Sequence, residues 1–97
     1  MKFRKKPIVV EAFQMTQKRR WDNSEWPEWL HRAWNEDSDV GSLYINESDS
    51  TRTELCIGTP EGPHTISWDD WIIQGVRGEL YLWKPDAFEA TYEPVDD

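Results

Sequence analysis

The chain has 97 residues, of which 37% are hydrophobic and 13% aromatic, and its net charge is −8. A chain of this length builds one core, so we expect a single domain over residues 1–97 and no large cleft. Residues 1–20 carry seven basic side chains against one acidic, whereas residues 21–97 carry four against eighteen. Nucleic acid and anionic lipid repel such an acidic chain, so we expect it to bind neither directly.

Cysteine and histidine usage points to no metal or redox chemistry. The single cysteine, Cys56, cannot form an internal disulfide and lies in an apolar run, as expected of a small core residue. His31 and His64 have no recognisable metal-ligand spacing. No apolar run approaches the roughly 18 residues of a membrane span, and no apolar signal segment follows Met1. We therefore expect a cytosolic protein without a cofactor.

The first predicted element is a strand over Phe3–Phe13, FRKKPIVVEAF. The β-branched run at 8–10 favours a strand, and Pro7 suits an edge position because it has no backbone N–H to donate. The basic residues Lys5 and Lys6 precede this run. They are interpreted either as a solvated edge that discourages aggregation or as a small anion-binding patch.

A helix is predicted in the stretch DNSEWPEWLHRAWNED, residues 22–37. Its start can be capped by Asn23 or Ser24, and Pro27 is tolerated only in a first turn. Apolar residues recur at helical spacing and would form one face that docks on a sheet. An aromatic ligand platform is the alternative for that face, which consists of Trp26, Trp29, Leu30, Ala33 and Trp34.

The second half of the chain reads as short strands separated by turns. Residues 42–46 and 52–57 predict a hairpin, and TPEGP leads into a short strand at 64–67. Residues 71–74 and 79–83 predict a second hairpin. Lys84-Pro85-Asp86 then breaks the strand and begins a helical turn, before a last predicted strand over Glu89–Val95.

These elements predict an α+β fold. We expect one amphipathic helix packed on a curved antiparallel sheet, or on a small partly open barrel, of five to seven short strands. We also expect the first strand to pair with the last, which would bring the chain ends together. That pairing would join Ile8, Val10 and Ala12 to Ala90 and Tyr92.

Few residues are placed for chemistry. Asp69 and Asp70 are adjacent and would act as a carboxylate pair only in a turn, so we interpret them as turn formers. A strand follows Gly75 and Gly78, whereas phosphate-binding glycine loops open a helix, which favours a tight reversal with Arg77 exposed at its tip. The spacing supplies no nucleophile, base or metal set, so we expect no enzymatic activity.

Two stretches carry a more specific pattern, MKFRKKPIVVEAFQ at residues 1–14 and DWIIQGVRGELYLWKPDAFEATYEPV at 70–95. They resemble a family of small uncharacterised bacteriophage and prophage proteins, whose members tend to begin MKFRKKPVVVEAFQ and to end PGDWII-G-V-GE-Y--KPD-FE-TYE. The two stretches cover 40 of the 97 residues. The resemblance implies an accessory phage gene and defines no reaction.

The chain departs from the family pattern at two places. Trp68-Asp69 stands where the family usually has Pro-Gly, which should replace a tight turn by an aromatic contact. Trp83 stands where the family often has cysteine. Both changes add an indole near one hairpin, and they mark either a contact surface or, as we favour, a paired repacking of one core layer.

We hypothesise a non-enzymatic phage accessory protein that binds and neutralises a host factor in the host cytoplasm, such as a component of antiviral defence. Its acidic segment would occupy the basic nucleic-acid groove of a host effector, and binding should weaken with salt. The candidate partner- or ligand-binding residues are Lys5, Lys6, Trp68, Asp69, Asp70, Arg77, Trp83 and Lys84.

Two alternatives stay open. One is a sponge for a nucleotide second messenger, in which aromatic rings stack on the base while Lys5, Lys6, Arg77 and Lys84 bind phosphate. Such a protein would form a homo-oligomer, because a small fold makes a deep pocket most easily at a subunit interface. The other alternative is a structural or assembly protein of the virion.

Overall fold

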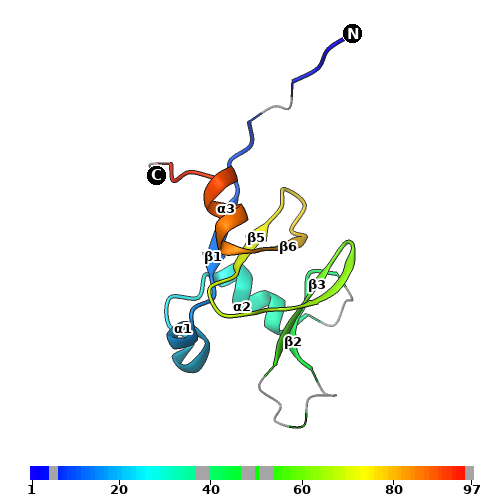
Figure 1. Ribbon diagram of the computed structural model, residues 1–97. Helices are drawn as coiled ribbons and strands as arrows, with labels where there is room; N and C mark the ends of the chain where they lie inside the picture. Colours follow the sequence, from blue (N-terminus) through cyan, green and yellow to red (C-terminus); the bar gives the residue numbers. More distant parts are fainter. Residues whose placement is uncertain (5–6, 37–39, 47–49, 51–53, 96–97) are drawn as a thin grey trace.

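The computed structural model describes residues 1–4, 7–36, 40–46, 50 and 54–95. Within these residues the α+β class is confirmed, but the helices and strands are arranged differently from the prediction (Figure 1). Two three-stranded antiparallel sheets, ordered β1-β5-β6 and β2-β3-β4, replace the expected single sheet or partly open barrel. The elements are β1 Glu11–Gln14, α1 Gln17–Asp22, α2 Glu28–Trp34, β2 Leu43–Ile45, β3 Leu55–Thr59, β4 Gly62–Thr65, β5 Trp71–Gln74, β6 Leu80–Trp83 and α3 Pro85–Thr91.

The first sheet, β1-β5-β6, is covered on both faces. Ile72 stands opposite Phe13 on one side and Leu82 on the other, and this row faces the core. Residues alternate between the two faces of a strand, so Trp71 and the other odd-numbered positions of β5 face away from it. Helix α3 covers that second face (Figure 1). The predicted hairpin at 71–83 is therefore confirmed as β5 and β6.

The second sheet, β2-β3-β4, has β3 at its centre, and all five residues of β3 are buried. Leu43 of β2 stands opposite Ile57 of β3, and both belong to the core. Helix α2 packs on β2 and contributes Leu30 and Ala33 to the same cluster. Strand β3 also lies against β6, so the two sheets and α2 share one core.

The predicted pairing of the first and last strands is wrong. Ala12 pairs with Ile73 of β5, and the chain around Ala90 is helical. Pro85 begins α3, where its missing N–H costs nothing. Phe88 of α3 stacks on Trp71 with ring centroids 4.0 Å apart. The aromatic residues of this segment have helical spacing, and this contact favours a helix over the predicted strand.

The first strand is also shorter than predicted. It begins at Glu11, and the β-branched Ile8 and Val9 are exposed on an arm that extends away from the body (Figure 1). The predicted strand at 64–67 shifts to Gly62–Thr65, where it pairs with β3. Lys5 and Lys6 lie outside the described residues, as does part of the segment 52–57.

The tryptophan-rich helix begins later than predicted, and a helix that was not predicted precedes it. The Thr16 side chain caps α1 by accepting a hydrogen bond from the N–H of Arg19. Asn23 and Glu25 then adopt positive φ angles, which separate α1 from α2. As a result Trp26 precedes α2, and Trp34 at its end is 44% exposed, so the expected stripe is only partly buried.

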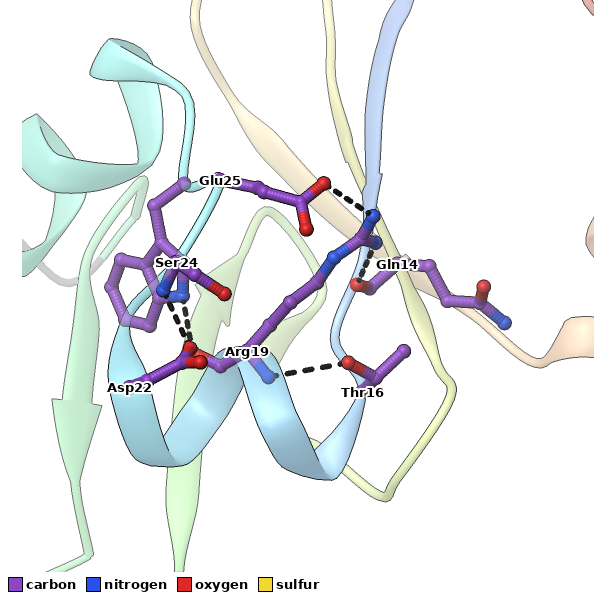
Figure 2. A network of polar contacts seen from close by, with 7 residues as sticks. Gln14, Thr16, Arg19, Asp22, Ser24 and Glu25 are labelled. Atoms are coloured by element: carbon purple, nitrogen blue, oxygen red, sulfur yellow. Dashed lines mark hydrogen bonds and ion pairs between the residues drawn. The ribbon is translucent and has the colours of Figure 1, made fainter.

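Arg19 joins α1 to β1 (Figure 2). Its guanidinium donates to the Gln14 carbonyl at 2.8 Å, pairs with Glu25 at 3.2 Å and lies over the Phe13 ring, 4.8 Å from its centroid. The Trp26 indole N–H donates to the Arg19 carbonyl at 2.9 Å. Arg19, one of the basic residues of segment 1–20, therefore stabilises the fold.

None of the described helices has the length and apolar character needed to cross a membrane.

Candidate interaction groove at Trp68

The turn at Ser67 to Asp70 leads from the second sheet into the first. The N–H of Asp70 donates to the Ser67 carbonyl at 3.1 Å, and Asp69 has a φ of 72°. Asp69 donates to the carbonyl of Met15 at 2.8 Å, while Met15 donates to the carbonyl of Asp70 at 2.9 Å. Asp69 and Asp70 thus lie opposite the single residue Met15. This arrangement is a β-bulge whose first residue, Asp69, has a left-handed conformation.

The expectation that Trp68-Asp69 replaces a tight turn is therefore wrong. The turn is retained, and Asp69 occupies the left-handed position that favours glycine. Asp tolerates this conformation better than most residues because its short side chain is compatible with positive φ. The Trp68 side chain is 48% exposed.

Asp70 braces this turn from inside. Its side chain is 1% exposed, and one carboxylate oxygen accepts from the Ser67 N–H at 2.8 Å and from the Lys84 ammonium at 3.2 Å. A buried carboxylate is tolerated when it is hydrogen-bonded and paired in this way. Asp69 is exposed, so the two acids do not form a carboxylate pair. Asp70 and Lys84 therefore have a structural task.

The tip of the β5–β6 hairpin is closed by Glu79. The N–H of Gly75 donates to the Glu79 carbonyl at 2.8 Å, and the N–H of Arg77 donates to the Glu79 carboxylate at 3.1 Å. A Cβ atom on Gly75 would overlap that carboxylate, and Gly78 has a φ of 85°. The glycines thus serve the tight reversal that was predicted, and Arg77 is exposed on it.

Trp83 belongs to the contact between the first sheet and α3. Its ring meets Tyr92 edge-on with centroids 5.3 Å apart, and Tyr92 stacks on Phe88 at 5.1 Å. Trp83 is therefore a packing residue. Trp68 and Trp83 have different environments, because Trp68 lines a groove to which none of the rings of this aromatic cluster contributes.

The groove lies where the two sheets meet and has a volume of about 310 Å³. Its floor is apolar and consists of the buried side chains Met15, Leu55 and Ile66. Its rim is polar and aromatic. The rim residues come from the start of β3, the end of β4 and the turn before β5, and they are Glu54, Thr65, Ser67 and Trp68.

The carboxylate on the rim is held in a fixed position. One oxygen of Glu54 accepts from the Asn46 amide at 2.7 Å and from the Thr65 hydroxyl at 3.2 Å. The Thr65 hydroxyl also lies 3.9 Å from the Cys56 sulfur. Burial raises the pKa of the Cys56 thiol, which keeps it neutral near pH 7.

The structure separates the residues that were predicted to act together. Trp68 lines the groove, Asp69 and Asp70 shape the turn beside it, and Lys84 is joined to Asp70. Arg77 lies at the hairpin tip and Trp83 under α3, away from the groove. Lys5 and Lys6 cannot be placed because they lie outside the described residues.

Sequence reasoning missed Met15, Glu54 and Thr65 as groove residues. Thr65 stands opposite Cys56 in the β3–β4 pair, so its hydroxyl and the Glu54 carboxylate are brought to one edge by strand register. The polar alternation near Thr65 was the available signal. It became interpretable only once the register of β3 and β4 was known.

Among the described residues, no group of three or more His, Cys, Asp or Glu side chains is placed to hold a metal ion. Comparison of the chain with protein-family models, with curated proteins and with solved structures finds no match.

Proposed function

We propose that the chain is a non-enzymatic accessory protein of phage origin that binds and neutralises a host protein in the host cytoplasm. The observation that carries this proposal is the half-exposed indole of Trp68 on the rim of a groove with an acidic group. Tryptophan is enriched among the residues that contribute most to protein–protein binding, because one side chain offers a large rigid contact area.

The charge of the chain indicates the kind of host protein. Residues 21–97 carry a balance of −14, from eighteen acidic and four basic side chains. Such a surface attracts a basic protein and speeds its approach, and a nucleic-acid-binding effector of antiviral defence has the matching charge. The resemblance of residues 1–14 and 70–95 to phage proteins supports the same context.

The structural roles of the residues in the C-terminal stretch also support a binding function over a catalytic one. Asp70, Gly75, Glu79 and Lys84 hold turns, and Phe88 packs α3 on the first sheet. These residues belong to the part of the chain that resembles the phage family. They build a frame, and Trp68, which lies two residues before this stretch, is a large apolar side chain that faces solvent beside a groove.

The nucleotide sponge receives less support from the geometry. A phosphate site requires cations beside the aromatic ring. The Lys84 ammonium already pairs with Asp70, and Arg77 lies at the opposite end of β6 from Lys84.

Affinity capture from lysate of the bacterial host tests the proposal. Tagged protein is incubated with lysate at about 50 mM and at about 500 mM salt, and the retained proteins and small molecules are identified by mass spectrometry. We expect a basic host protein retained at low salt, released at high salt, and lost with Trp68→Ala. Retention that is indifferent to salt, or a nucleotide retained in its place, would overturn the proposal.

A further inference from the structure

We propose that two copies of the chain associate by pairing their residues 8–12 as strands. The two strands run antiparallel about a two-fold axis at Val10 and join the two β1-β5-β6 sheets into one. This self-association is separate from the binding of a host protein and does not depend on it. It follows from the end of β5, the open edge of β1 and the sequence of the arm before β1.

The arm before β1 has the sequence of a strand but no partner strand among the described residues. Strand β5 ends at its pair with Glu11, and the next residue, Gly75, belongs to the hairpin turn. The β-branched residues at 8–10 therefore extend beyond the end of β5. Ile8 is 56% exposed and Val9 is 76% exposed, on the arm that leads away from the body (Figure 1). Such residues favour a strand, and an unpaired strand is a template for pairing with another chain.

The outer edge of β1 is closed at one end and open at the other. Met15 exchanges backbone hydrogen bonds with the turn before β5, so every second residue counted back from Met15 points its backbone groups toward β5. The backbone groups of Ala12 and Gln14 therefore point outward. The Arg19 guanidinium occupies the Gln14 carbonyl (Figure 2). No strand of the described part of the chain lies on this edge, so the outward groups of Ala12 are available to a second chain.

The same alternation selects the register of the pair. In an extended arm the N–H and C=O groups of Ile8 and Val10 point to the same edge as those of Ala12. Antiparallel pairing then places Val10 opposite Val10 of the second copy, and Ile8 opposite Ala12. Pro7 fits this register, because the side on which it has no N–H faces away from the second copy.

A second copy of the chain suits this edge by charge and by sequence. Residues 1–10 carry four basic side chains and no acidic one, whereas residues 11–97 have a balance of −12. Antiparallel pairing brings the basic start of each arm to the acidic body of the other copy, which offsets the repulsion between two chains of charge −8. The β-branched side chains of the two arms also become cross-strand neighbours, which stabilises a sheet. Both copies use the same edge, so the association closes at a dimer.

Sedimentation equilibrium of the intact protein measures the self-association. We expect a monomer–dimer equilibrium with a dissociation constant of about 10–100 µM, because so short a strand pair buries less area than a standard interface. Val10→Pro removes the N–H at the axis and should weaken the dimer at least about tenfold. Val9→Pro is the matched control, because the Val9 N–H points away from the second copy, and it should change the constant by no more than about threefold. Unchanged far-ultraviolet circular dichroism verifies that both variants fold.

Disulfide formation between two variants tests the register. Val9 of one copy would stand opposite Glu11 of the other in a non-hydrogen-bonded pair, where Cα atoms are about 4.5 Å apart and a disulfide can form. Two Val9 residues, or two Glu11 residues, would be more than about 7 Å apart, which is too far. With oxidised glutathione, a mixture of Val9→Cys and Glu11→Cys should give a covalent dimer at least about tenfold faster than either variant alone. The buried Cys56 of the parent protein should give none.

Three results would overturn the inference. They are a parent protein that stays monomeric up to about 1 mM, a dimer that Val10→Pro and Val9→Pro weaken equally, and equal covalent dimer in the mixture and in the single variants. A monomeric parent that loses a captured host protein with Val10→Pro would also overturn it, because the edge then binds a strand of the host protein. Trp68→Ala should leave the dimer unchanged, so failure of the self-association and failure of the proposed function are distinguishable.

Discussion

The ammonium of Lys84 lies 3.2 Å from the carboxylate of Asp70, a side chain that is 1% exposed. Lys84 immediately precedes α3, and Asp70 closes the turn that precedes β5. The pair therefore ties the turn beside the Trp68 groove to the start of the last helix. Both residues are candidates for ligand binding in the sequence, and in the structure their contacts stabilise the frame of the groove.

Replacing each member of this pair should have unequal effects. Asp70→Ala removes the acceptor of both the Ser67 N–H and the ammonium, so we expect a loss of about 2–3 kcal/mol in the free energy of unfolding. Lys84→Met should cost about 1 kcal/mol or less, because the Lys84 side chain is 61% exposed and solvent screens its charge. Urea denaturation measures both values. A larger loss for Lys84→Met than for Asp70→Ala would contradict this description of the turn.

Asp69→Gly should stabilise the protein. Asp69 has a φ of 72°, a conformation that glycine adopts without strain. We expect a gain of about 0.5–1 kcal/mol, because the relief of strain exceeds the added freedom of glycine in the unfolded chain. Thermal unfolding of Asp69→Gly and Asp69→Ala provides a matched comparison. Alanine should be destabilising, and a melting temperature for Asp69→Gly below that of Asp69→Ala would show that the turn has another geometry.

The aromatic contact of α3 should be essential for the last helix. Phe88 stacks on Trp71 at 4.0 Å and on Tyr92 at 5.1 Å. Phe88→Ala should lower the free energy of unfolding by about 2–3 kcal/mol and weaken the near-ultraviolet circular dichroism of the tryptophans. Ala87→Ser, at the exposed neighbouring position, is the control and should change little. Unchanged dichroism for Phe88→Ala would indicate that residues 85–91 do not pack on the sheet.

The Cys56 thiol should react slowly in the folded protein. Cys56 is buried, and its burial raises the pKa of the thiol, so little thiolate forms near pH 8. A raised pKa stabilises the folded state at low pH, and this contribution is lost as the pH rises from the ordinary cysteine value through the raised one. Alkylation followed by mass spectrometry should be at least about tenfold faster in urea than in buffer. Equal rates in the two solvents would mean that the thiol is accessible at the surface.

The sequence predicted correctly those elements that are determined by a few neighbouring residues. Gly75 to Gly78 marked the reversal between β5 and β6, and Lys84-Pro85-Asp86 marked the end of β6 and the start of a helical turn. The alternation at 89–95 was misinterpreted as a strand. Phe88 and Tyr92 have helical spacing, and only the presence of Trp71 and Trp83 on the facing sheet favours the helix.

The sequence patterns did not predict the features that depend on contacts between distant parts of the chain. The division into two sheets depends on which strand β1 pairs with, and its partner β5 lies about 60 residues further along the chain. The groove depends on the same choice, because it brings Met15 beside Leu55 and Trp68. Trp68 was identified as a candidate because it departs from the pattern of the phage family that the chain resembles and adds an indole near a hairpin. The carboxylate of Glu54 was not, because no local motif contains it.

The most direct test of the central claim measures the affinity of the captured host protein for three forms of the chain at low salt. These are the parent protein, Trp68→Ala, and Trp21→Ala as a control at an exposed indole outside the groove. We expect Trp68→Ala to bind at least about tenfold more weakly, and Trp21→Ala to bind within about twofold of the parent. Equal affinity for the parent and Trp68→Ala would contradict recognition through this groove.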